Sequence, residues 1–152
     1  MFKKLLKFII ILLPWFLGGL IFRGNPEYYN SLNLPSFAIP SNLFFPIWTV
    51  LYILISISIY MILESFSLKE IKDYRNSLFT NYLFNQLYTF FFFTLKSPFL
   101  GFIDVTITFI TALFLYYETK ELSKKASYFL LPYVFFTLFA TVLNLTIYFM
   151  NL

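Results

Sequence analysis

Two residue types with rich chemistry are missing from this sequence. Its 152 residues include no cysteine and no histidine. The first absence excludes disulfides, thiolate metal sites and iron–sulfur clusters, and the second removes the commonest metal ligand and general base. Charge is also scarce, since Asp, Glu, Lys and Arg make up only 12% of the chain. We therefore expect no metal site and no catalytic residue, and favour a function other than that of an enzyme.

Hydrophobic residues make up most of the chain. They account for 60% of it, whereas a soluble domain has about 45–50% apolar and about 25% charged residues. A helix needs about 20 apolar residues to cross the roughly 30 Å hydrocarbon core of a bilayer. Apolar runs of that length occupy residues of about 5–22, 43–63, 78–95, 98–117 and 127–149. The sequence predicts an all-α integral membrane protein, a bundle of five transmembrane helices forming one domain over residues 1–152.

The basic residues divide unequally between the two ends of these spans. Only Arg23 and Lys96 fall at the end opposite the N-terminus. The other nine are Lys3, Lys4, Lys7, Lys69, Lys72, Arg75, Lys120, Lys124 and Lys125. Because Lys and Arg near span ends stay in the cytoplasm, we predict a cytoplasmic N-terminus, an outer C-terminus and a multi-pass protein of the cytoplasmic membrane. No other basic cluster indicates a nucleic-acid partner.

A long connection rich in proline joins the first two spans, at about residues 23–42. It contains Pro26, Pro35 and Pro40. Proline fixes φ and restricts the residue before it, so we expect extended or turn geometry over LPSFAIPSNLFFP rather than a continuation of either helix. Long loops in compact proteins are often lids or binding loops. This loop would lie outside the membrane.

Polar residues inside the spans recur at helical spacing, so that each stripe shares one helix face. The stripes are Trp48 and Tyr52; Asn81, Asn85 and Tyr88; Asp104, Thr108 and Thr111; and Tyr133, Thr137, Ala140, Asn144 and Asn151. We expect all four to face inward. One interpretation is that they join the helices by hydrogen bonds. The other is that Trp48, Asn85 and Ala140 line a cavity in which an indole N–H and an amide orient an apolar ligand.

Asp104 is the only acidic residue well within a predicted span. An intramembrane carboxyl group is costly, so it has either a structural partner or a function. One interpretation is a protonated side chain hydrogen-bonded to a neighbouring helix. The other is a functional acid on a path for protons or a ligand.

Three groups of residues occur in the order and at the spacing of a known family. The last span contains Pro132, Tyr133, Phe136, Ala140, Leu143, Asn144 and Asn151. The first loop and second span contain Tyr28, Tyr29, Leu32, Pro35, Phe37, Pro40, Pro46, Trp48, Leu51 and Tyr52. The third span contains Asn85, Tyr88, Thr89, Phe92 and Phe93. From about residue 14 to 151 the chain resembles the TspO/MBR family, the tryptophan-rich sensory and translocator (peripheral benzodiazepine receptor) proteins.

The resemblance implies a five-helix bundle, commonly a homodimer, that binds tetrapyrroles such as protoporphyrin IX and other hydrophobic molecules beneath the first loop. No cofactor would be required, although a porphyrin could be bound. Trp48 and Asn85 would be the polar contacts of the ligand. The ligand-binding residues implied by the matching positions are Tyr29, Pro40, Trp48, Tyr52, Asn85, Tyr88, Ala140 and Leu143.

The chain departs from the family pattern at several tryptophan positions. The residues that stand where the pattern has tryptophan are Tyr28, Phe37, Tyr88 and Phe136. Some bacterial relatives degrade porphyrin in light through loop tryptophans, and these substitutions argue against that activity here. We therefore predict a porphyrin-binding protein or sensor, with two alternatives: a small transporter for a metabolite or protons that uses Asp104, and light-dependent porphyrin degradation.

Overall fold

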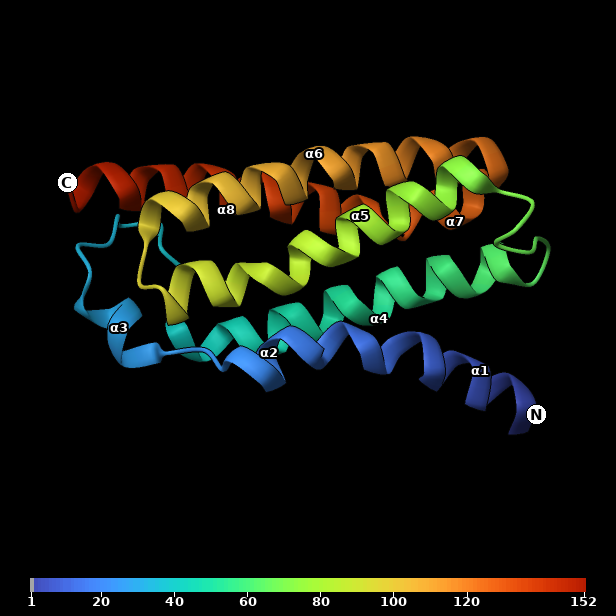
Figure 1. Ribbon diagram of the computed structural model, residues 1–152, viewed down its shortest axis with the longest axis horizontal. Helices are drawn as coiled ribbons and strands as arrows, with labels where there is room; N and C mark the ends of the chain where they lie inside the picture. Colours follow the sequence, from blue (N-terminus) through green and yellow to red (C-terminus); the bar gives the residue numbers. More distant parts are fainter. Residues whose placement is uncertain (1) are drawn as a thin grey trace.

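The computed structural model describes residues 2–152, and every element within them is a helix. The elements are α1 (Phe2–Leu12), the 3₁₀-helix η1 (Leu13–Phe16), α2 (Leu17–Phe22), α3 (Pro26–Ser31), η2 (Ser41–Leu43), α4 (Phe44–Leu63), α5 (Lys72–Thr89), the π-helix η3 (Phe90–Thr94), α6 (Pro98–Leu122), α7 (Lys124–Tyr128) and α8 (Leu131–Met150). The long helices run lengthwise beside one another, and the two termini lie at opposite ends (Figure 1). The short helix α3 lies at the same end as the C-terminus (Figure 1).

Four helices are long and apolar enough to cross a membrane: Phe2–Phe22, Ser41–Leu63, Pro98–Leu122 and Lys124–Met150. The all-helical structure with these four candidate spans is consistent with the predicted helical membrane protein. The segment α5–η3 is a fifth long helix within the bundle, but it carries charged residues and several side-chain amides and is not one of the four. A fifth crossing, and the direction in which the chain enters the membrane, stay predictions.

Two helices extend beyond the apolar runs from which they were predicted. Helix α5 begins at Lys72, well before the apolar stretch expected from residue 78, and α6 continues to Leu122 beyond the expected end at 117. The added turns contain charged residues such as Asp73 and Lys120. Lys and Glu favour helix as strongly as apolar residues do, so hydropathy underestimates helix length where a helix leaves the bilayer.

The first loop contains more helix than its prolines predicted. Pro26 occupies the first turn of α3, and the Asn25 side chain caps that helix by accepting a hydrogen bond from the Tyr28 amide at 2.8 Å. The prediction of extended or turn geometry is also wrong for residues 41–46, which form η2 and the start of α4. Pro46 lies in the first turn of α4, where a missing N–H breaks no helical hydrogen bond.

Two glycines allow helices on either side of α5–η3 to approach it closely. A Cβ atom on Gly18 of α2 would lie 2.6 Å from the carbonyl oxygen of Gln86 on α5. A Cβ atom on Gly101 of α6 would lie 2.5 Å from Cδ2 of Phe92 in η3. Larger side chains at these positions would push the helices apart. The glycines therefore fix the spacing of α2, α5 and α6.

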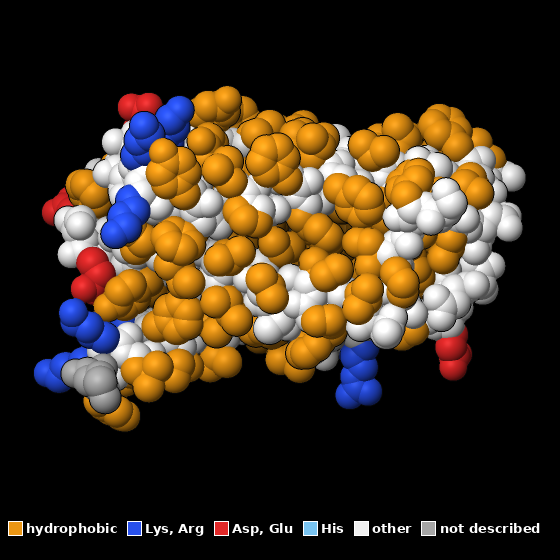
Figure 2. All heavy atoms as spheres, turned by 180° about the vertical axis from the view of Figure 1, so that it is seen from behind, with side chains coloured by type: hydrophobic (Ala, Val, Ile, Leu, Met, Phe, Trp, Pro, Cys, Tyr) orange, Lys and Arg blue, Asp and Glu red, His pale blue; other side chains and the backbone are white. Residues whose placement is uncertain are grey.

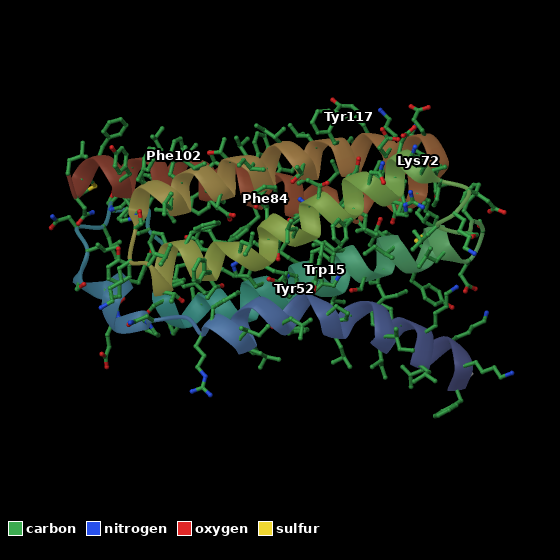
Figure 3. All side chains as sticks on the ribbon, in the orientation of Figure 1. Trp15, Tyr52, Lys72, Phe84, Phe102 and Tyr117 are labelled. Carbon is green, nitrogen blue, oxygen red and sulfur yellow. The ribbon has the colours of Figure 1, made fainter. Side chains whose placement is uncertain are left out.

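Trp15 packs in the core of the bundle. Its side chain is 3% exposed, and its ring lies 5.7 Å from that of Tyr52 and 5.2 Å from that of Tyr82, measured between centroids. Figure 3 shows Trp15 and Tyr52 between the first helical segment and α4, whereas Tyr117 points away from the bundle. The Tyr82 hydroxyl donates to the Pro14 carbonyl at 3.0 Å. These contacts hold the first segment against α4 and α5.

Charged and apolar side chains occupy different parts of the surface. Charged side chains gather at the N-terminal end of the molecule, and apolar side chains cover most of its length (Figure 2). At the charged end, Lys7 Nζ lies 2.8 Å from Glu64 Oε1 and ties α1 to the end of α4. The hydrogen bond from Lys7 lowers the pKa of the Glu64 carboxyl below its usual value. This distribution suits a protein whose middle faces lipid.

Candidate functional site

A cavity of about 370 Å³ lies beneath the first loop, and α2, α4, α5, η3, α6 and α8 all contribute to its walls. Seven residues named from the sequence line it: Tyr29, Trp48, Tyr52, Asn85, Tyr88, Ala140 and Leu143. The eighth, Pro40, is exposed and does not line it, whereas Ile39 and Ser41 on either side do. Successive residues of an extended segment face opposite sides. This alternation turns Pro40 away from the cavity.

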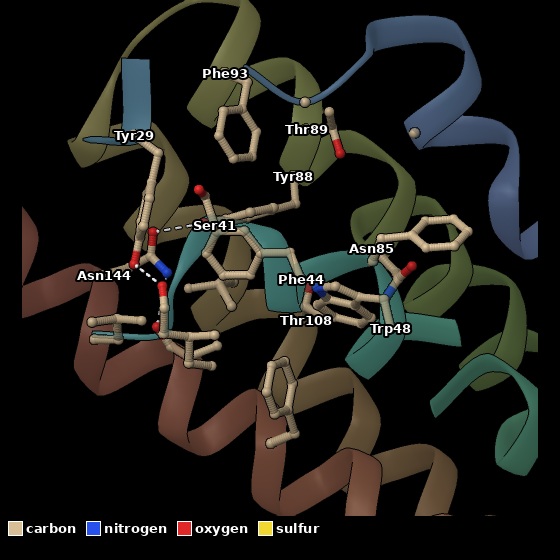
Figure 4. A pocket seen from close by; sticks show the side chains of 18 of the residues that line it. Tyr29, Ser41, Phe44, Trp48, Asn85, Tyr88, Thr89, Phe93, Thr108 and Asn144 are labelled. Atoms are coloured by element: carbon tan, nitrogen blue, oxygen red, sulfur yellow. Dashed lines mark hydrogen bonds between the residues drawn. The ribbon is translucent and has the colours of Figure 1, made fainter. Parts of the chain in front are cut away.

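Aromatic rings form much of the cavity wall. Trp48 lies 5.4 Å from Tyr52 and 5.3 Å from Phe136 between ring centroids, and Tyr29 lies 4.9 Å from Phe44. The close-up shows rings from α4 and α5 around the same space (Figure 4). Such edge and offset contacts are the favoured arrangement of aromatic side chains. The wall presents extended apolar surfaces to a flat molecule.

Trp48 also offers a polar group. Within residues 2–152 no hydrogen bond engages its indole N–H, and the side chain lines the cavity. A buried indole N–H usually finds a partner. The half-buried Trp48 side chain can therefore donate a hydrogen bond to a ligand.

Asn85, by contrast, is largely engaged with its neighbours. Its Oδ1 accepts hydrogen bonds from the Tyr52 hydroxyl and Gln86 Nε2, each at 3.0 Å. Its Nδ2 donates to the Tyr133 hydroxyl at 3.2 Å. The second hydrogen on Nδ2 of Asn85 is left for a further hydrogen bond. A direct contact of Asn85 with ligand stays a prediction, and the geometry first gives this residue a role in joining α4, α5 and α8.

The network continues away from the cavity. The Tyr133 hydroxyl donates to Asn81 Oδ1 at 3.0 Å, and Asn81 Nδ2 donates to the Thr108 carbonyl and Thr111 Oγ1, each at 3.0 Å. Asn81 therefore joins α5 to α6 and α8, which is the interhelical interpretation of its stripe. Sequence reasoning missed Gln86, whose Oε1 accepts from the Gly18 amide at 2.6 Å. Its signal was present, since a glutamine inside an apolar span is unusual.

Hydrogen bonds also hold the loop over the cavity. The Tyr29 hydroxyl donates to the Ile39 carbonyl at 2.9 Å, and burial raises the pKa of this hydroxyl, so it stays protonated. The backbone N–H of Asn33 donates to Asn151 Oδ1 at 2.9 Å, and Asn151 Nδ2 donates back to the backbone carbonyl of Asn33 at 3.0 Å. The second pair fastens the loop to the end of α8.

Asp104 lies outside the cavity lining. Its side chain is 2% exposed, and neither carboxyl oxygen has a hydrogen-bond partner among residues 2–152. The hydrogen bond to a neighbouring helix, one of the two interpretations of its sequence, is thus absent from that range. Thr108, one turn further along α6, lines the cavity and also has a buried hydroxyl without a partner. A functional role for Asp104 stays a prediction.

The chain is similar to known membrane proteins over nearly its whole length. A sequence model described as the TspO/MBR family matches residues 7–150. An uncharacterized membrane protein of Bacillus subtilis, YtaB, is 37% identical over 145 residues, which cover 95% of this chain and 94% of that protein. The tryptophan-rich protein TspO of Bacillus cereus is 32% identical over 154 residues, covering 99% and 100% of the two chains. The tryptophan-rich protein TspO of Archaeoglobus fulgidus is 32% identical over 97% of both chains.

Proposed function

The chain belongs to the TspO/MBR family, and from this premise we propose that it is a binding protein or sensor for porphyrins and similar flat hydrophobic molecules. The ligand occupies the cavity beneath the loop, and protoporphyrin IX represents its class. Trp48 donates a hydrogen bond, and the surrounding rings supply stacking surface. No cofactor is needed for this function.

The aromatic cavity is the observation that carries the proposal. Its volume of about 370 Å³ lies within the range of about 300–1,000 Å³ that is typical of small-molecule sites. Two of its lining residues, Leu20 of α2 and Phe45 of α4, are 70% and 73% exposed. The cavity therefore opens toward the apolar outer surface between α2 and α4. A planar ligand larger than the enclosed volume could extend through this opening.

The proposal includes the arrangement of the chain in the cell membrane. We propose that α5–η3 is a fifth crossing, with the N-terminus in the cytoplasm and the C-terminus outside. The uneven distribution of Lys and Arg supports this orientation, and it places the loop and cavity on the outer side. Assembly as a homodimer carries over from the family resemblance.

Titration of the purified protein with protoporphyrin IX tests the proposal. We expect saturable binding, followed by the shift of the porphyrin absorption band in the dark. The two tryptophans give a matched pair, because Trp48 lines the cavity and Trp15 does not. Trp48→Phe removes the proposed donor and should raise Kd about tenfold, whereas Trp15→Phe should leave Kd within about twofold of wild type.

Three outcomes of this titration are distinguishable. Non-saturable uptake, equal in both variants, would mean that the porphyrin merely partitions into the micelle and would contradict the proposal. Saturable binding that is unaffected by Trp48→Phe would contradict the assigned hydrogen bond. Loss of porphyrin absorbance in light, faster than in a protein-free control, would indicate degradation instead.

A second candidate function, movement of protons or a small metabolite, is favoured by the unpartnered carboxyl group of Asp104. It predicts that Asp104→Asn abolishes flux in proteoliposomes without changing the Kd for porphyrin. Asp73→Asn, in the first turn of α5, is the matched control. Unchanged flux in Asp104→Asn would exclude this candidate.

A further inference from the structure

The two basic residues outside the N-terminal end of the molecule line one surface cleft. Arg23 follows α2, and Lys96 lies in the connection between η3 and α6. Both border a cleft beside α3, together with Thr94 and Glu27. Two basic residues that are distant in the sequence therefore line the same cleft.

Both residues adopt a backbone conformation that favours glycine. Arg23 has a φ of 48° and Lys96 a φ of 50°, and they are the only non-glycine residues with positive φ within residues 2–152. Gly24, directly after Arg23, does not have a positive φ. Such conformations persist where the surrounding structure enforces them, and they cluster at ligand-binding sites.

Neither cation is neutralised within the described chain. The one ion pair in residues 2–152 joins Lys7 to Glu64 at the opposite end of the molecule. Glu27 borders the cleft but forms no ion pair with Arg23 or Lys96. Lys96 Nζ lies 5.9 Å from the centre of the Tyr28 ring, a contact that leaves its N–H groups free for an anion. Two basic residues and one acidic residue therefore line the cleft.

The cleft adjoins the apolar cavity. Gly24, Asn25, Pro26 and Phe93 line both. On the basis of the proposed function, we infer that Arg23 and Lys96 form an anion subsite for carboxylate groups on the ligand whose flat apolar body occupies the cavity. Carboxyl groups with a pKa of about 4 are ionised at neutral pH, and Arg and Lys bind carboxylates through charge-assisted hydrogen bonds. The ligand class is therefore a flat amphipathic acid.

A matched pair of probes tests this inference: protoporphyrin IX, which has two carboxylates, and its dimethyl ester, which has none. Their Kd ratio is measured in dodecyl maltoside for wild type and for the double variant Arg23→Gln/Lys96→Gln. Exposed ion pairs contribute modestly, so we expect the preference of wild type for the diacid to fall about three- to tenfold in the double variant. The Kd for the dimethyl ester should stay unchanged.

The control variant is Lys69→Gln/Lys125→Gln, which removes the same charge from exposed positions away from the cleft. It should retain the wild-type ratio. Higher salt should reduce the preference of wild type, because screening weakens exposed charge interactions. An equal ratio in wild type and both double variants would overturn the inference while leaving the cavity proposal intact. Failure of both probes to bind would contradict the proposed function itself.

A lipid phosphate is the other anion that these cations could bind. We therefore repeat the measurement in phosphatidylcholine nanodiscs. A ratio that depends on Arg23 and Lys96 in both detergent and nanodiscs supports the ligand subsite. Dependence in detergent that is lost in nanodiscs would mean that lipid headgroups occupy the two cations, and would overturn the inference.

Discussion

The side-chain amide of Asn85 forms hydrogen bonds with three other side chains, those of Tyr52, Gln86 and Tyr133. Hydrogen bonds between transmembrane helices average about 0.6 kcal/mol each. Asn85→Ala should therefore lower the free energy of unfolding by about 1 kcal/mol, because the bonds with Tyr52 and Tyr133 join α5 to α4 and α8, whereas the bond from Gln86 lies within α5. Thermal unfolding in detergent measures this loss.

Thr146→Ala is the control for Asn85→Ala. The Thr146 hydroxyl is exposed and bonds only within its own helix, to the Val142 carbonyl. The Thr146→Ala variant should therefore unfold at a temperature close to that of wild type. Unchanged stability in Asn85→Ala, with lost porphyrin binding, would show instead that this amide serves the ligand.

Ala140 offers a way to fill the cavity from α8. Its side chain lines the cavity, so Ala140→Leu places three additional carbon atoms where a ligand would lie. We expect Kd for protoporphyrin IX to rise about tenfold, which corresponds to about 1.4 kcal/mol. Val142→Leu, at a position 50% exposed and outside the cavity, should bind like wild type. Equal affinities in both variants would place the ligand elsewhere.

At the residue scale the sequence predicts the positions of inward-facing groups better than their roles. Periodicity places Trp48, Asn85 and Ala140 on inner helix faces, and all three line the cavity. It does not predict that the amide of Asn85 is taken by Tyr52 and Tyr133. Those partners depend on how far α4 and α8 are shifted along α5. The residue pattern of one helix carries no information about this shift.

At the scale of elements, the loop depends on the helix that ends beside it. The two hydrogen bonds between Asn33 and Asn151 join the loop to the end of α8. Asn151→Ala removes both, each contributing about 0.5–1.5 kcal/mol. We expect faster amide hydrogen exchange over residues 32–40 and a porphyrin dissociation rate raised about tenfold. Mass spectrometry after exchange and stopped-flow displacement measure the two effects.

Asn30→Ala provides the comparison, because Asn30 is exposed on α3 within the same loop. It should leave both exchange and dissociation as in wild type. If Asn151→Ala speeds exchange without changing dissociation, the loop is not the barrier to ligand release.

The element that the sequence predicts least completely is the end of α5. Four successive phenylalanines predict a continued apolar helix, whereas Phe90–Thr94 forms a π-helix. Gly101 of α6 lies close to Phe92 in this turn. π-helical turns occur frequently at functional sites, and this one contributes Phe93 to both the cavity and the cleft.

For the whole molecule, the long helices follow from hydropathy, but membrane topology depends on α5–η3. Four helices have the length and composition of spans, and an even number would return the chain to its starting side. The termini nevertheless lie at opposite ends of the structure (Figure 1). The amides that make α5 less apolar are satisfied by neighbouring helices through Asn81, Asn85 and Gln86. A helix whose polar groups are bonded inside the bundle can cross a bilayer despite moderate hydropathy.

The absence of cysteine allows a direct test of this crossing. Lys69→Cys precedes α5 and Lys96→Cys follows η3, so the two new thiols lie on opposite sides only if α5–η3 spans the membrane. We expect a membrane-impermeant maleimide to label Lys96→Cys in cells whose cytoplasmic membrane is intact and to label Lys69→Cys only after permeabilisation. Lys125→Cys, between α6 and α8, should behave like Lys69→Cys. Labelling of Lys69→Cys and Lys96→Cys from the same side would remove the fifth crossing, and labelling of Lys69→Cys alone from outside would invert the orientation.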